Sequence, residues 1–324
     1  MKELIITKND AGQRVDRFLS KAVPLLPEAL LQKYIRLKRV KLDGRAAKRD
    51  EKLREGAVLR LYINDEFFET PSPDNAYLKI NTPRLILVYE DDNILIADKR
   101  PGVLSHAGDG IFEDTLIDNI KAYLYQNGQW KPRDEHSFAP ALANRIDRNT
   151  GGLVLAAKNA EALRILNEKL KAREISKYYL CAVLGAPEPP EGILRGYIFK
   201  DAVKNRVYVK NSPEPGAKLA STRYRTLKTL DGLSLLECEL LTGRTHQIRA
   251  QLATAGTPLL GDGKYGSEKQ NRAFGQKGQA LYSYKLRFDF TADAGILNYL
   301  RGKELRVSEV PFAENIFSLR IVDI

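Results

Sequence analysis

The chain has 324 residues, an apolar fraction of 43% and a formal net charge of +11 at pH 7. This length corresponds to about two domains, and the apolar fraction is that of an ordinary folded protein. The longest apolar runs are far shorter than the roughly 18 residues of a membrane span, and residues 1–10 lack the pattern of a secretory signal. Two cysteines and three histidines form neither a disulfide framework nor a multi-ligand metal centre. We therefore expect a cytoplasmic protein with no membrane anchor, no disulfide-linked partner and no metal centre.

The first 66 residues carry more than half of the net positive charge, with 16 Lys and Arg against 10 Asp and Glu. Apolar residues recur at helical spacing over residues 15–22 and again after Pro27, which predicts two helices. The stretch VKLDGRAA (residues 40–47) predicts two strands joined by an Asp-Gly turn, and residues 56–63 predict a further strand. The segment 1–66 is therefore predicted to be a small α/β domain.

One face of this small domain is expected to be cationic. Residues 32–49 contain eight basic residues and one acidic residue. A solvated face normally mixes the two signs, so contact with phosphate explains this run better than a generally basic surface does. The segment resembles the small RNA-binding domain first known from ribosomal small-subunit protein four. That resemblance implies phosphate contacts, which position RNA without reading its sequence, by Lys33, Arg36, Lys38, Arg39, Lys41 and Arg45.

A linker and a larger domain are predicted to follow. Residues 67–83 are rich in Pro, Asn, Asp and Thr and have no hydrophobic period, which is typical of a linker. Over residues 84–324, short apolar runs bounded by turn residues predict strands: LILVYE, NILIADK, GLVLAAK, KYYLCAVLG and LSLLECELL. Helices are predicted over residues 160–175 and after Thr115, an N-cap residue, with Gly128 beyond the helix end. Because strands outnumber helices without alternating strictly with them, the predicted fold class is α+β, with a mixed, largely antiparallel sheet.

Two loops and one strand contain the residues that are candidates for chemistry. The stretch NRIDRNTGG places Asp147 between Arg145 and Arg148, where positive charge favours the carboxylate; a turn aspartate bonded to nearby backbone is the alternative. The stretch LLTGRTHQIR places Arg244, His246 and Arg249 close together, and a lone histidine there could equally be structural. In KYYLCAVLG, two tyrosines alternate on a strand, so one points inward and needs a hydrogen-bond partner. The glycine-bearing GDGKYG fits no P-loop or dinucleotide motif.

Read in chain order, these motifs have a known counterpart. NRIDRNTGGLVLAAK, the K-x-Y pattern at Lys177 and Tyr179, and TGRTHQIR followed by GTPLLGD and YG closely resemble the RluA family of RNA pseudouridine synthases. DNILIADKRPGVLSHAG and ALYSYKLRF resemble an earlier motif and a later strand of that family. The resemblance spans residues 85–290 and implies an isomerase that converts specific uridines of structured RNA to pseudouridine without a cofactor. We expect the protein to act as a monomer. Large-subunit ribosomal RNA is the substrate we expect; transfer RNA, or a non-catalytic ribosome assembly factor, is the alternative.

The resemblance also implies roles for single residues. Asp147 would act on the ribose, either as a nucleophile or by removing a neighbouring sugar proton, and Arg249 would pair with it. Tyr179 would stack on the target base, and Arg145 would fill the gap left when the uridine is flipped out. Thr150, Arg244 and His246 would bind substrate. The chain departs from the family pattern at Asn144, Gly151, Pro101 and Gln251, which indicates a divergent branch without removing any of the three catalytic candidates, Asp147, Tyr179 and Arg249.

Overall fold

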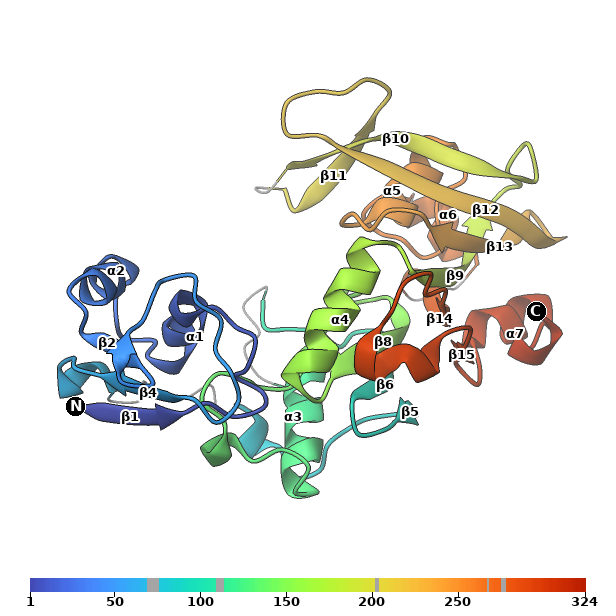
Figure 1. Cartoon of the computed structure of the whole chain (residues 1–324). Coiled ribbons are helices and arrows are strands. Elements are labelled where there is room, and N and C mark those ends of the chain that lie inside the picture. The colour runs from blue at the N-terminus through green and yellow to red at the C-terminus, as the bar shows by residue number, and fades with distance from the viewer. Residues whose placement is uncertain (69–75, 109–113, 202–203, 267, 275–277) are drawn as a thin grey trace.

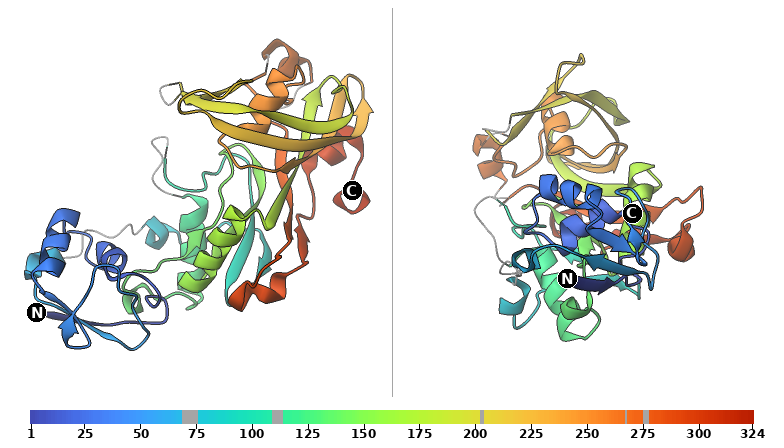
Figure 2. Two further views of the ribbon diagram at one scale, coloured as in Figure 1. Left: turned by 45° about the horizontal axis from the view of Figure 1, so that its top comes forward. Right: turned by 60° about the vertical axis from the view of Figure 1, so that its left-hand side comes forward.

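The structure of the chain is a computed structural model that describes residues 1–68, 76–108, 114–201, 204–266, 268–274 and 278–324 (Figure 1). A small unit built from the first 61 residues lies at one end of the molecule, and a long sheet with its covering helices forms the rest (Figures 1 and 2). Within the described residues, no helix is long and apolar enough to cross a membrane.

The small unit is a four-stranded antiparallel sheet packed against two helices. Its strands are β1 (Lys2–Ile5), β2 (Val40–Leu42), β3 (Arg45–Ala46) and β4 (Val58–Leu61), in the order β1-β4-β2-β3, and its helices are α1 (Val15–Ala22) and α2 (Glu28–Arg36). Both predicted helices and the predicted hairpin are present. Asp43 and Gly44 have positive φ angles of 48° and 83°, as a tight hairpin turn requires.

Two details of the small unit differ from the sequence prediction. Strand β1 was not predicted, because only Leu4 of its four residues is buried and no alternation can be read from it. Helix α2 ends at Arg36, and Lys38 lies in the left-handed region with φ 58°. Lys38 and Arg39 therefore lie in the turn that leads to β2, beyond the end of the helix.

The segment predicted as a linker is only partly described, since residues 69–75 lie outside the described residues. A short 3-10 helix, η2 (Ala76–Lys79), follows them. Within it Tyr77 is buried, and its ring centroid lies 5.5 Å from that of Tyr125 and 5.2 Å from that of Trp130. The end of this segment is therefore packed against the larger domain instead of being a free connection.

The larger domain is built on an 11-stranded sheet. Its main path runs β11 (Arg206–Lys210), β10 (Glu191–Asp201), β12 (Lys218–Leu230), β13 (Leu233–Leu240), β9 (Ile175–Leu184), β14 (Leu281–Phe288), β8 (Gly151–Ala157), β6 (Ile94–Lys99) and β5 (Leu87–Glu90). The short strands β7 (Ala141–Leu142) and β15 (Glu304–Arg306) pair with β8 and β14. Among the pairings of described strands only β8 with β14 is parallel, which confirms the mixed, largely antiparallel prediction.

Helices cover both faces of this sheet. They are α3 (Leu116–Gln126) and α5 (Gln247–Thr254) on one face and α4 (Ala160–Lys171) and α7 (Pro311–Phe317) on the other. The remaining short elements are α6 (Glu268–Ala273) and the 3-10 turns η3 (Pro132–Asp134), η4 (Gly295–Leu300) and η5 (Ile321–Asp323). The 3-10 turn η1 (Asp65–Phe68) packs against the small unit. Thr115 caps α3 as predicted, and Gly128 follows its end with φ 69°. The predicted extension of α4 to Ile175 is wrong: Arg173 has φ 63°, and Ile175 is the first residue of β9.

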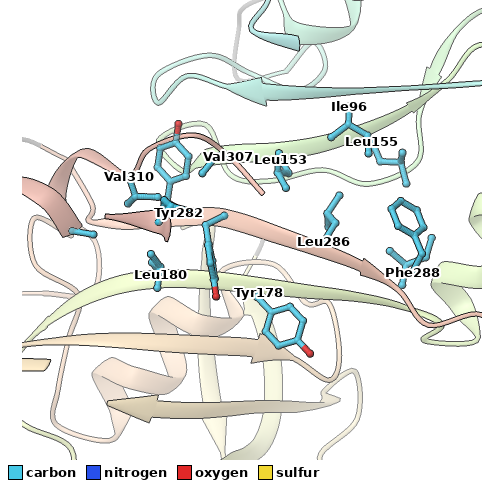
Figure 3. Close-up of a cluster of buried hydrophobic side chains, with 14 of the residues drawn as sticks. Ile96, Leu153, Leu155, Tyr178, Leu180, Tyr282, Leu286, Phe288, Val307 and Val310 are labelled. Atoms are coloured by element: carbon cyan, nitrogen blue, oxygen red, sulfur yellow. The ribbon is translucent and has the colours of Figure 1, made fainter. Parts of the chain in front are cut away.

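Alternate residues of the central strands pack into two separate cores. Leu153 and Leu155 of β8 point into one core, which also contains Leu286 and Phe288 of β14 (Figure 3). Val154 of the same strand points into the other core, on the opposite face. Because β8 is buried along its whole length, the loop that enters it is held on a rigid support.

The two domains contact each other through polar side chains. Asn9 Nδ2 donates to Glu135 Oε1 at 2.7 Å, and Gln13 Nε2 donates to Ser137 Oγ at 2.9 Å. The Ser137 hydroxyl in turn donates to Asp10 Oδ1 at 2.6 Å. These contacts use the loop after β1 and, among the described residues, none of them involves the basic residues between positions 33 and 45.

Candidate active site

A cavity of about 300 Å³ lies where three chain segments meet: the loop before β8, strand β9, and the loop between β13 and α5. The structure brings all seven candidate residues of the larger domain to this cavity, although they come from distant parts of the sequence. They are Arg145, Asp147, Thr150, Tyr179, Arg244, His246 and Arg249.

Asp147 lies at the mouth of the cavity on a loop that is anchored on both sides. Its carboxylate is 26% exposed, while the preceding Ile146 is buried. The Asp147 carbonyl accepts the backbone N–H of Thr150 at 3.1 Å. Asn144 Oδ1 accepts the backbone N–H of Leu155 at 2.7 Å, which ties the start of the loop to β8. The carboxylate is therefore presented to the cavity by a fixed backbone.

Lys99, at the end of β6, is a further anchor of this loop that was not assigned a role from the sequence. It is buried, and its ammonium donates to the carbonyls of Arg100, Val103 and Arg148 at 3.0, 2.8 and 2.9 Å. Burial lowers its pKa to about 7, although the charges of Asp147 and Asp98 act in the opposite direction. Only the pairing of β6 with β8 brings this lysine beneath the turn that follows Asp147.

Arg249, on α5, forms the ion pair with Asp147 that the family resemblance implied. Its Nη1 donates to Asp147 Oδ2 at 3.0 Å. Its Nε and Nη2 donate to both oxygens of Asp262 at 2.7 and 3.0 Å, in the bidentate geometry that is strongest for this pair. Burial alone would raise the pKa of Asp262, but hydrogen bonds from Arg249 and from the backbone of Lys264 and Tyr265 hold it below its ordinary value. Asp262 therefore fixes the Arg249 guanidinium through Nε and Nη2, while Nη1 holds the Asp147 carboxylate.

His246 lies against Asp147 as well. It precedes α5 with φ 51°, a left-handed conformation that is uncommon for a residue other than glycine. Its Nε2 is 3.8 Å from Asp147 Oδ2, and its Nδ1 is 2.9 Å from the Tyr265 hydroxyl. Burial lowers the pKa of His246, Asp147 raises it and Arg249 lowers it further, with a lower pKa as the net result. A neutral imidazole beside the carboxylate is therefore favoured at neutral pH.

Tyr179 forms the inner wall of the cavity, and its neighbour Tyr178 points to the other face, where Lys285 Nζ lies 4.2 Å from its ring centroid. Tyr179 is buried and makes a hydrogen bond with Ser283. Burial raises the pKa of Tyr179 to about 12; the Ser283 hydrogen bond opposes this shift and the Asp147 charge adds to it. The residue is thus an uncharged aromatic surface facing the cavity.

The other three predicted contacts differ in their accessibility. Arg145 and Arg244 are exposed at the mouth of the cavity, and Arg244 Nε donates to the Leu219 carbonyl at 3.1 Å. Thr150 is buried, and its hydroxyl accepts from Gln279 Nε2 at 2.6 Å. Its position therefore suits holding the loop better than binding a substrate directly.

Two of the departures from the family pattern, Gly151 and Gln251, are explained by internal packing. A Cβ atom at Gly151 would overlap the ring of Tyr282, its partner in the parallel pairing of β8 with β14. Gln251 accepts from the Thr222 hydroxyl at 2.7 Å and donates to the carbonyl of Leu194 at 3.0 Å, so it joins α5 to the sheet. Neither residue reaches the cavity.

The candidate phosphate contacts of the small domain lie outside this cavity. Lys33, Arg36, Lys38, Arg39 and Arg45 are exposed and Lys41 is partly buried. The Arg39 guanidinium and the Lys41 ammonium each lie 5.2 Å from the centre of a tyrosine ring. Among the described residues no group of three His, Cys, Asp or Glu side chains could hold a metal ion.

Most of the chain is similar to known RNA pseudouridine synthases. Residues 93–254 match the RNA pseudouridylate synthase family. An uncharacterized RNA pseudouridine synthase of Mycoplasma genitalium is 32% identical over 294 residues, covering 88% of each chain. Ribosomal large subunit pseudouridine synthase D of Nitrosomonas europaea is 33% identical and covers 82% of this chain and 72% of its own length. Ribosomal large subunit pseudouridine synthase C of Escherichia coli is 29% identical, with coverage of 87% and 85%.

A solved structure shares the fold. The structure titled Human RNA Pseudouridylate Synthase Domain Containing 1 superposes with a TM-score of 0.54 at 21% sequence identity. The match covers 72% of this chain and 86% of the human one. The larger domain therefore has the fold of that protein.

Proposed function

Because the chain belongs to the RNA pseudouridine synthase family and is an isomerase that converts uridine in RNA to pseudouridine, we propose that its substrate is large-subunit ribosomal RNA and that Asp147 carries out the chemistry. The observation that carries the assignment of Asp147 is its carboxylate, held at the cavity mouth by Arg249 at 3.0 Å. The substrate assignment is supported by the names of relatives that match this chain over most of its length, two of which are ribosomal large subunit enzymes.

The reaction breaks the bond between C1′ of the ribose and N1 of uracil, turns the base, and joins C1′ to C5. A carboxylate next to the ribose can bond to C1′ directly or can remove the proton from C2′. The Arg249 ion pair serves both routes, since it keeps the carboxylate oriented. The Tyr179 ring offers an apolar surface on which the turning base would rest.

The RNA would reach this cavity with the target uridine out of its stack, because a base inside a helix is inaccessible to the enzyme. Arg145 is exposed at the mouth, where it would occupy the space that the uridine leaves. The basic residues of the small domain would hold phosphates elsewhere on the same RNA. In this proposal the enzyme acts as a monomer in the cytoplasm.

Pseudouridine mapping on unmodified large-subunit ribosomal RNA and on unmodified transfer RNA tests this proposal. The wild-type chain is expected to modify a uridine of the ribosomal RNA, and Asp147→Asn is expected to modify none while still binding the RNA. Modification of transfer RNA alone would refute the substrate assignment. Product formed by Asp147→Asn at the wild-type rate would refute the assignment of Asp147.

A further inference from the structure

Lys177 is a cation in the catalytic cavity, and it has no role in the reaction described above. It lines the cavity together with Asp147 and Tyr179. It precedes Tyr179 by two positions on β9, so the two side chains leave the same face of the strand about 6.6 Å apart. Any base that rests on the Tyr179 ring therefore lies within reach of the lysine side chain.

The ammonium of Lys177 has no counter-charge in the part of the chain that the structure describes. It makes no hydrogen bond and no ion pair with any of those residues. A Cβ atom added to Gly243, across the cavity wall, would lie 3.7 Å from Lys177 Nζ. Burial lowers the pKa of Lys177. Since a lysine ammonium that is largely removed from water is normally paired, the missing negative charge is expected to come from a bound molecule.

The surroundings of Lys177 favour the base of the bound nucleotide over its phosphate. A cavity of about 300 Å³ is at the lower end of the range for small-molecule sites, so it has room for a single nucleotide. The exposed cations, Arg145 and Arg244, lie at the mouth, where the RNA backbone would pass. Lys177 is only partly exposed and lies beside Tyr179. The negative charge expected beside Tyr179 is that of uracil after it leaves the ribose.

We propose that Lys177 donates a hydrogen bond to a carbonyl oxygen of the target uracil and stabilises the negative charge of the detached base. This inference rests on the proposed function for its substrate. When the C1′–N1 bond breaks, the bonding electron pair leaves with uracil and is shared among N1, O2 and O4, while C1′ is held by Asp147 or becomes part of a glycal. The base then bonds to C1′ through C5, which either displaces Asp147 or, in the glycal route, returns to C2′ the proton that Asp147 had removed. C5 releases one proton, and N1 takes up one. The Lys177 ammonium keeps its own protons throughout.

Two substitutions at position 177 test the proposal in the full-length enzyme. Lys177→Met keeps the length of the side chain without its charge, and Lys177→Arg keeps the charge. The substrate is whichever RNA the wild-type chain modifies in the mapping experiment, so an error in the ribosomal assignment leaves this test intact. The single-turnover rate and the Kd for that RNA are measured for each variant, and Lys171→Met, at the exposed end of α4, is the control.

Loss of one donor to a developing negative charge costs about 10²- to 10³-fold in rate. Lys177→Met is therefore expected to be slower by about 10²-fold with a Kd within about threefold of the wild type, and Lys177→Arg is expected to recover part of that loss. An unchanged rate for Lys177→Met would overturn the proposal. A weaker Kd with a smaller salt dependence and an unchanged rate would also overturn it, because that result identifies a phosphate contact. If Lys177→Met does not fold, Lys177→Gln replaces it, with the same expected and contradicting results.

Discussion

Replacing Asp262 with Asn is expected to destabilise the larger domain and to slow catalysis, although Asp262 is buried behind Arg249 and is not part of the cavity wall. The substitution keeps the size of the side chain and an oxygen for the backbone N–H groups of Lys264 and Tyr265, which Asp262 Oδ1 accepts at 2.9 and 3.1 Å. It removes the charge that both Nε and Nη2 of Arg249 face. Asp147 is then the remaining negatively charged partner of this buried guanidinium among the described residues.

The size of the expected stability loss follows from the burial of the Arg249–Asp262 ion pair. Neutralising one partner of a buried ion pair costs about 3–5 kcal/mol, because the other charge stays buried without compensation. Arg249 keeps its contact with the partly exposed Asp147, so the lower end, about 3 kcal/mol, is expected. For a domain of this size each kcal/mol changes Tm by about 2–4 °C, and the expected fall is therefore about 6–12 °C. Asp147→Asn leaves the bidentate pair intact and is expected to lower Tm by less than about 2 °C.

Thermal unfolding followed by circular dichroism at pH 7, together with the rate of pseudouridine formation, measures both effects. Glu268→Gln is the matched control, since it neutralises an exposed pair with Arg272 whose side chains are 79% and 82% exposed. Pairs of that kind contribute less than about 1 kcal/mol. A wild-type Tm and rate for Asp262→Asn would show that Asp262 does not hold Arg249 in place, and the reasoning would be wrong.

The same pair predicts a dependence of stability on pH. The folded-state pKa of Asp262 lies below its ordinary value, which for the unfolded chain is about 3.9. The stabilisation from this carboxylate is therefore fully present above about pH 4 and is lost as the pH falls through the folded-state pKa. Asp262→Asn is expected to lose less stability than the wild type between pH 5 and the acid limit.

Two further predictions concern packing and charge. Gly151→Ser is expected to destabilise the chain by about 1–3 kcal/mol, since the new Cβ overlaps the Tyr282 ring. In chemical denaturation, the double variant with Tyr282→Ala should lose less free energy of unfolding than the sum of the losses of the two single variants. Simple additivity of the two losses would contradict the steric explanation. Lys33→Ala with Arg36→Ala is expected to weaken RNA binding and to reduce the slope of log K against log salt by about 0.7–0.9 for each phosphate that the variant no longer neutralises. An unchanged slope would mean that these side chains do not touch the RNA.

The sequence alone determined the features that depend on neighbouring residues. The Asp43-Gly44 turn, the Thr115 cap and the buried run after Asp147 follow from the chemistry of a few adjacent positions. The motif around Asp147, in its order relative to TGRTHQIR, was enough to predict the family. Strands β10 to β12 were missed because their exposed and buried residues alternate, which breaks the continuous apolar runs on which the prediction depended.

Only the tertiary structure decided which partners these residues have. Arg249 and Asp147 are 102 positions apart, and no spacing rule connects them. The roles of Asp262 and Lys99 as supports, and the unpaired state of Lys177 among the described residues, were likewise invisible in the sequence. The physical reason is that a charged side chain acquires its surroundings when strands far apart in the chain pair and remove it from water. Local patterns specify the strands, whereas the pairing of the strands specifies which charges meet.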